Sequence, residues 1–171
     1  METLKTKKIA TGGILLALSL VTLLGATFVP GIELTLYALS TVYVAVMIIE
    51  FSPRAGWLFY SASVIVSLIL VPNKAGIIPY AIFFGIYAMI KYYIESIKKI
   101  HQWLEIIFKL IICNTLLGLG FVSFGEIFTG AIQVPDLAFP IIIIGSQVFF
   151  LAYDYILTLV IGFYQKQRPK A

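Results

Sequence analysis

The sequence is poor in charged residues, cysteine and histidine. Charged residues make up 12% of the 171 residues, about half the share in a soluble globular domain, whereas 61% are hydrophobic. A soluble domain of this length could not bury so much apolar side chain, because much of its surface must face water. This excludes a soluble enzyme, a nucleic-acid-binding domain and a disordered scaffold. It predicts a single integral membrane domain over residues 1–171, in contact with the lipid bilayer.

The lack of chemically reactive side chains excludes most catalytic sites. The only cysteine, Cys113, lies in an apolar run, so no intramolecular disulfide can form and a small buried hydrophobic role is expected. The only histidine, His101, precedes a predicted helix and has no metal-ligand spacing to Cys113. No nucleophile motif and no phosphate-binding glycine fingerprint occurs. We therefore expect no cofactor, no metal and no enzymatic activity.

Long apolar runs are abundant, and they predict an all-α polytopic bundle of six transmembrane helices. A hydrocarbon core about 30 Å thick needs roughly 20 apolar helical residues. The runs are separated by turn residues, among them Pro30-Gly31, Ser52-Pro53-Arg54 and Pro72-Asn73-Lys74. The predicted spans are 9–28, 34–49, 55–71, 77–93, 104–124 and 139–163.

The distribution of basic residues predicts how the bundle is oriented. With six spans, both termini share one side of the membrane with the connections at 50–54 and 94–103. That side carries ten basic residues, against Lys74 alone on the other side: Lys5, Lys7, Lys8, Arg54, Lys91, Lys98, Lys99, Lys166, Arg168 and Lys170. Because basic loops stay on the cytoplasmic side, both termini are expected in the cytoplasm of a cell with a bacterial-type membrane.

The presence of four polar residues inside the predicted spans requires a structural or functional explanation, because polar groups are costly in hydrocarbon. Asn114 and Gln147 reach similar depths in the outer half of the bundle from opposite chain directions. They either line a ligand cavity or hydrogen-bond to each other between helices. Lys109 and Asp154 lie in the inner half, where a structural ion pair is expected ahead of a proton or ion relay.

Further hydrogen-bonding and aromatic residues gather at the predicted outer ends of the second and fourth spans and in the adjoining loops. Aromatic faces with a few hydrogen-bonding groups suit a flat organic ligand. We therefore predict a substrate site in the outer half of the bundle, between the second, fourth, fifth and sixth helices. Its predicted residues are Glu33, Tyr37, Asn73, Lys74, Tyr80, Tyr87, Asn114 and Gln147.

A stripe of small residues runs along the cytoplasmic half of the first predicted helix. Ala10, Gly13 and Ala17 stand at i, i+3 and i+7, a spacing that places them on one helix face. Small residues let a second helix approach closely. The stripe therefore packs either within the bundle or against a partner subunit.

Two segments resemble the substrate-binding S component of energy-coupling factor (ECF) vitamin transporters. The run Lys7-Lys8-Ile9-Ala10-Thr11-Gly12-Gly13-Ile14-Leu15-Leu16-Ala17-Leu18 is similar to the Lys-rich opening and small-residue motif of that family's first helix. The segment Phe51-Ser52-Pro53-Arg54-Ala55-Gly56 resembles the Gly-Pro-Lys/Arg-x-Gly turn that often joins its second and third helices.

The resemblance implies a six-helix fold and a role in uptake without chemical change of the substrate. An S component captures a vitamin or similar small organic nutrient from outside. It delivers the nutrient through a transmembrane scaffold subunit and two cytosolic ATPase subunits. The family's scaffold contact would map onto Gly13 and Ala17. The resemblance names no particular vitamin.

Two other functions stay open. A non-transport membrane scaffold of the MreD cell-shape type has six helices and a similar length. A channel or an intramembrane enzyme is the third possibility. An outward-open cavity lined by Asn114 and Gln147 would favour the nutrient binder, whereas a packed interior would favour the scaffold.

Overall fold

The computed structural model describes residues 2–29, 31–97, 101–129 and 139–167. Side chains are described for 6–29, 31–97, 101, 103–119 and 143–167. Within these ranges the protein is helical and no residue lies in a strand, which confirms the all-α class. The chain divides into two compact units, Met1–Ser96 and Ile97–Ala171. Each unit is described by itself.

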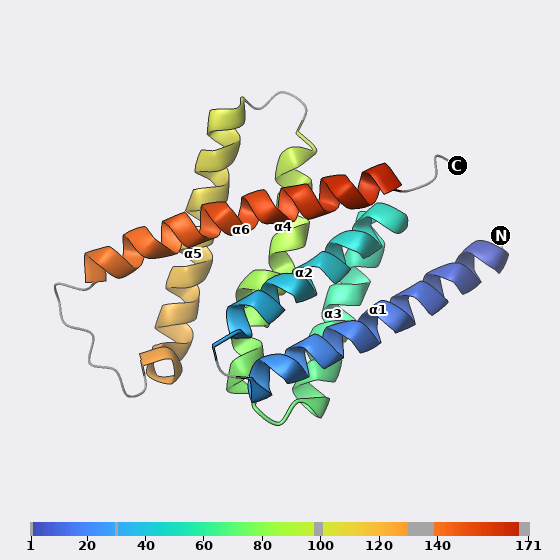
Figure 1. Ribbon diagram of the computed structural model, residues 1–171, viewed down its shortest axis with the longest axis horizontal. Helices are drawn as coiled ribbons and strands as arrows, with labels where there is room; N and C mark the ends of the chain where they lie inside the picture. Colours follow the sequence, from blue (N-terminus) through green and yellow to red (C-terminus); the bar gives the residue numbers. More distant parts are fainter. Residues whose placement is uncertain (1, 30, 98–100, 130–138, 168–171) are drawn as a thin grey trace. The chain divides into compact units, whose positions relative to one another are not determined.

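The first unit is built around its second helix (Figure 1, blue to green). Its elements are α1 (Glu2–Phe28), α2 (Glu33–Glu50), α3 (Pro53–Leu70), η1 (Ala75–Ile77), η2 (Tyr80–Phe84) and α4 (Gly85–Glu95). Because α2 packs against α1, α3 and α4, it forms the centre of this unit. Accordingly, the buried residues of α2 include Tyr37, Val44 and Ile48.

The helix ends of the first unit are fixed by short-range hydrogen bonds. Gly31 precedes α2 with a φ of 93°, a conformation that favours glycine, and its N–H donates to Glu33 Oε2 over 2.8 Å. Ser52 is the N-cap of α3, where its Oγ accepts a hydrogen bond from the Ala55 N–H over 3.2 Å. These bonds explain why the chain turns close to the breaks that the sequence predicts.

The fourth hydrophobic segment is a composite of 3₁₀, π and α turns. Its π turn, η2, spans Tyr80–Phe84 and directly precedes α4. Side chains of neighbouring helices donate to carbonyls of this turn. Thr41 Oγ1 donates to the Phe84 carbonyl over 2.8 Å, and Tyr60 OH donates to the Ala81 carbonyl over 2.5 Å. Because π turns distort the α-helical hydrogen-bond ladder, such outside donors stabilise them.

The second unit consists of two long helices, α5 (Gln102–Thr129) and α6 (Phe139–Gln167), coloured yellow to red in Figure 1. Polar side-chain contacts join them, among them Asn114 with Gln147 and Lys109 with Asp154. Cys113 on α5 and Phe150 on α6 are buried. The burial of Cys113 confirms the role expected for it.

Among the residues whose side chains the structure describes, five helical segments are long and apolar enough to cross a membrane: Thr6–Phe28, Glu33–Glu50, Pro53–Leu70, Ala75–Glu95 and Ile143–Gln167. These five overlap five of the predicted spans, and α5 is helical over the stretch predicted as the fifth. The first and last helices extend beyond the apolar runs. The added turns contain lysines such as Lys7 and Lys166, and lysine favours the helical conformation. The ammonium group of a long lysine side chain can also reach the membrane interface. The finding is compatible with a multi-pass membrane protein.

Candidate functional site

The two amides that the sequence places at similar depth are hydrogen-bonded to each other. Gln147 Nε2 donates to Asn114 Oδ1 over 2.7 Å, and Asn114 Nδ2 lies 3.4 Å from Gln147 Oε1. Asn114 Nδ2 also donates to the Leu110 carbonyl over 3.0 Å. The mutual contact confirms the interhelical hydrogen bond that the sequence allows. Asn114 is nevertheless exposed and Gln147 partly exposed, so the pair is open on one side. A ligand contact there stays a prediction.

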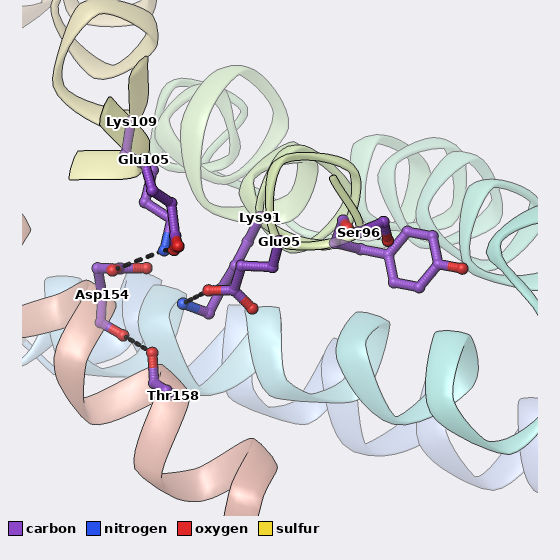
Figure 2. Close-up of polar contacts among 8 residues, drawn as sticks. Lys91, Glu95, Ser96, Glu105, Lys109, Asp154 and Thr158 are labelled. Atoms are coloured by element: carbon purple, nitrogen blue, oxygen red, sulfur yellow. Dashed lines mark hydrogen bonds and ion pairs between the residues drawn. The ribbon is translucent and has the colours of Figure 1, made fainter. Parts of the chain in front are cut away.

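A three-residue ionic cluster lies on the same two helices (Figure 2). The Lys109 ammonium lies 3.0 Å from Asp154 Oδ2 and 2.7 Å from Glu105 Oε1, and its side chain is 5% exposed. The pairing of Lys109 with Asp154 confirms the ion pair expected from the sequence. Sequence reasoning missed Glu105, although its position one helical turn before Lys109 is the spacing of a helical ion pair. The Lys109 ammonium therefore has a carboxylate partner on each of the two helices.

The first unit contains a second buried lysine at the end of α4. Lys91 Nζ lies 2.6 Å from Glu95 Oε1, four residues later on the same helix (Figure 2). The Lys91 side chain is almost completely buried. A buried ammonium with a carboxylate partner is the arrangement that limits the cost of removing a charge from water. The sequence analysis placed Lys91 in a basic cytoplasmic region and did not predict its burial.

The tyrosines predicted to contact substrate are part of the packed interior of the first unit. Tyr37, Tyr80 and Tyr87 are all buried. Tyr80 OH is 2.7 Å from Ser63 Oγ, and the Tyr87 ring stacks on Phe83 at 6.1 Å between centroids. Their faces therefore contact protein in this structure. A role in ligand binding would require them to exchange these neighbours for the ligand.

Glu33, at the start of α2, and the loop residues Asn73 and Lys74 have local structural contacts. Glu33 closes the turn before α2, as described above. Lys74 Nζ donates to the Val71 carbonyl over 2.8 Å and to the Ile69 carbonyl over 3.3 Å, at the C-terminal end of α3. Asn73 Oδ1 accepts from the Gly76 N–H over 3.3 Å. Each contact stabilises a helix end or a turn, so substrate binding by these residues remains a prediction.

Buried hydroxyl groups connect the helices of the first unit, and sequence reasoning did not identify most of them. Thr22 Oγ1 on α1 lies 2.8 Å from Ser40 Oγ on α2. Ser63 on α3 contacts Tyr80, and its own carbonyl accepts a hydrogen bond from Ser67. The available signal was the recurrence of small hydroxyl residues within apolar spans, which often form interhelical hydrogen bonds.

The small-residue stripe of α1 faces away from the other helices of the first unit. Ala10, Gly13 and Ala17 are exposed. A methyl group added at Gly13 would meet no heavy atom within 4 Å. Large exposed side chains, Ile14 and Val21, flank the stripe along the helix. Within the first unit, the other helices therefore leave a shallow strip of small residues uncovered.

The described residues offer hydrogen-bonding groups and charges but no cluster of three or more His, Cys, Asp or Glu suited to a metal ion. Comparison with models of known families, with curated proteins and with solved structures finds no match to this chain. Over the described part of the chain, the geometry establishes helical structure without strands, five segments fit to span a membrane, and polar contacts between α5 and α6 that include Asn114 with Gln147 and Lys109 with Asp154.

Proposed function

We propose that the protein is the substrate-capture subunit of an ECF-type uptake transporter, with six membrane spans and both termini in the cytoplasm. It binds a vitamin or a similar small organic nutrient from outside. It then passes the nutrient through a transmembrane scaffold subunit that two cytosolic ATPase subunits drive. The proposal rests on the resemblance in the first helix and in the connection between the second and third helices, and on the exposure of one face of the first helix.

The exposed stripe of Ala10, Gly13 and Ala17 is the observation that carries the proposal. Lipid chains pack against membrane helices without any need for small residues, whereas a second helix can approach closely only where side chains are small. The stripe is uncovered along the half of α1 in which the family has its scaffold contact. A partner helix docked there would account for its composition and its exposure together.

The amide pair gives the proposed subunit a possible ligand contact. Asn114 and Gln147 present polar atoms on an exposed part of the second unit, and Gln147 lies within a candidate span. Amides that face lipid are costly, so an exposed pair at this depth favours a polar neighbour such as a nutrient. An amide pair can exchange its mutual hydrogen bonds for bonds to a ligand.

A second candidate is a membrane scaffold of the MreD cell-shape type. The same pair supports this alternative, because Asn114 and Gln147 already satisfy each other. The buried tyrosines Tyr37, Tyr80 and Tyr87 support it as well, since a packed interior is what a protein without a ligand needs. A ligand screen distinguishes the two candidates.

Thermal-shift measurements on the purified protein against B vitamins, their precursors and amino acids test the proposal. We expect at least one compound to raise the melting temperature. Asn114→Ala and Gln147→Ala should each weaken binding of that compound by roughly 5- to 150-fold, since truncation leaves a ligand group unpaired. Thr115→Ala is the matched control, because Thr115 is exposed beside Asn114 and bonds only to the Ile111 carbonyl of its own helix. A screen without any stabilising compound would favour the scaffold.

A further inference from the structure

Two interfacial aromatic residues from different helices meet at one end of the first unit. Trp57, in the first turns of α3, directs its indole Nε1 toward Tyr93 OH near the end of α4, at 3.4 Å. Trp57 is 39% exposed and Tyr93 is 50% exposed. The two rings therefore present their polar atoms side by side at the surface. Tryptophan and tyrosine are enriched at the level of lipid headgroups because one end of each ring is apolar and the other polar.

A basic side chain without an ion partner lies beside this pair. Arg54 is exposed and stands three residues before Trp57 on α3, so the two side chains share a helix face. Its guanidinium makes no hydrogen bond or ion pair with any residue that the structure describes. The first turn of a helix also disfavours a cation, because the helix dipole is positive there. Arg54 is therefore available to an anion from outside the chain.

We propose that Arg54, Trp57 and Tyr93, here called the Arg54 patch, bind the phosphate of an anionic phospholipid in the adjacent membrane leaflet. The guanidinium supplies paired donors that match phosphate oxygens. Tyr93 OH, which accepts from Trp57, keeps its own proton to donate to the phosphate. The exposed apolar parts of the two rings contact the upper acyl chains.

The surrounding charges are compatible with an anionic ligand. Glu95, at the end of α4, is ion-paired with Lys91 over 2.6 Å. Its charge is therefore largely compensated, whereas that of Arg54 is not. The loops on this side are expected to be cytoplasmic, where anionic lipids concentrate and basic residues gain affinity for the membrane surface. The inference concerns a lipid contact and does not rest on the proposed transport function.

Native mass spectrometry of the purified full-length protein, with phosphatidylglycerol or phosphatidylcholine added, tests the proposal. The wild-type protein should retain phosphatidylglycerol in preference to phosphatidylcholine. Arg54→Gln should lower its affinity about fivefold, the effect of one basic residue at a membrane surface. Arg54→Lys should retain part of the affinity, and Tyr93→Phe should lower it by less than Arg54→Gln.

Lys7→Gln is the matched control, since it removes the same charge at an exposed position on α1. Its affinity for phosphatidylglycerol should equal that of the wild type. Equal losses in Lys7→Gln and Arg54→Gln would mean that only total charge matters and would overturn the proposal. Unchanged binding in Arg54→Gln would overturn it as well. Displacement of the lipid by excess inorganic phosphate would assign the patch to free phosphate instead.

Discussion

Gln147 Nε2 donates to Asn114 Oδ1 over 2.7 Å, while Asn114 Nδ2 lies 3.4 Å from Gln147 Oε1, so one amide pair links α5 to α6. Removing either member leaves the other without its interhelical partner. Interhelical hydrogen bonds in membrane proteins contribute about 0.6 kcal/mol on average and about 1.7 kcal/mol at most. The pair is therefore a modest but specific link between the two helices of the second unit.

A double-mutant cycle of Asn114→Ala and Gln147→Ala should give a coupling free energy of about 0.6–1.7 kcal/mol. Thermal or denaturant unfolding of the purified variants measures it. The cycle of Asn114→Ala with Ser146→Ala is the control, because the hydrogen bond of Ser146 among the described residues goes to the Ile143 carbonyl of its own helix. That second cycle should be additive. Additivity in both cycles would show that the amide contact has no energetic role.

The ionic cluster predicts that its lysine is more sensitive to replacement than its aspartate. Lys109→Met removes the ammonium that lies against both Glu105 and Asp154, so a loss of about 3–5 kcal/mol in unfolding free energy is expected. Asp154→Asn keeps the Lys109–Glu105 pair and should cost less. Adding Glu105→Gln and Asp154→Asn to Lys109→Met should recover part of the stability. Melting temperatures of the four proteins check this order, and a greater loss for Asp154→Asn would contradict it.

Two glycines, Gly85 and Gly162, differ in the space around them. A methyl group at Gly85 would lie 2.7 Å from the Tyr60 ring and 3.0 Å from the Tyr80 carbonyl oxygen, within the π turn region. Gly85→Ala should therefore destabilise the protein by about 1–3 kcal/mol through overpacking. Gly162 on α6 has no heavy atom within 4 Å of the same position, so Gly162→Ala should be neutral or stabilising by up to about 1 kcal/mol. Thermal unfolding compares the two, and equal effects would show that the close approach to Tyr60 is not needed.

Hydropathy predicted the helices well because lipid imposes a length on apolar segments. The predicted span 34–49 compares with α2 at Glu33–Glu50, and 55–71 compares with α3 at Pro53–Leu70. The π turn at Tyr80–Phe84 could not be predicted in this way. Its carbonyls accept hydrogen bonds from Thr41 and Tyr60, which lie about 40 and 20 residues earlier in the chain, and no local periodicity records such partners.

The contacts in the candidate site were predictable where the depth of two residues along their spans is enough to bring them together. Lys109 with Asp154, and Asn114 with Gln147, reach matching depths from opposite chain directions, and the structure joins both pairs. Depth could not show whether Tyr80 faces a ligand or the packed interior. That depends on the direction of its side chain, which Ser63 on another helix determines.

Cysteine labelling tests the proposed orientation. Lys74 lies between α3 and η1 and is exposed, and Lys7 is exposed near the start of α1. With cytoplasmic termini, a membrane-impermeant thiol reagent should label Lys74→Cys in intact cells but should label Lys7→Cys only after permeabilisation. The native Cys113 is buried and should stay unlabelled. If Lys7→Cys is labelled in intact cells and Lys74→Cys is not, the protein has the opposite orientation.

The exposed stripe on α1 makes the partner contact testable by steric substitution. Gly13→Leu adds four carbon atoms where a partner helix must approach closely, and one lost helix contact of about 1–2 kcal/mol shifts association about tenfold. We expect pull-down of an ATPase–scaffold module to fall about tenfold, while the melting temperature stays close to that of the wild type, since Gly13 has open space around it. Leu18→Phe is the matched control, because it adds bulk at an exposed position about 100° around α1 from the stripe. Its pull-down should be unchanged. If Gly13→Leu associates as tightly as Leu18→Phe, the stripe is not the docking face, and the resemblance of the first helix to that of an S component loses its structural support.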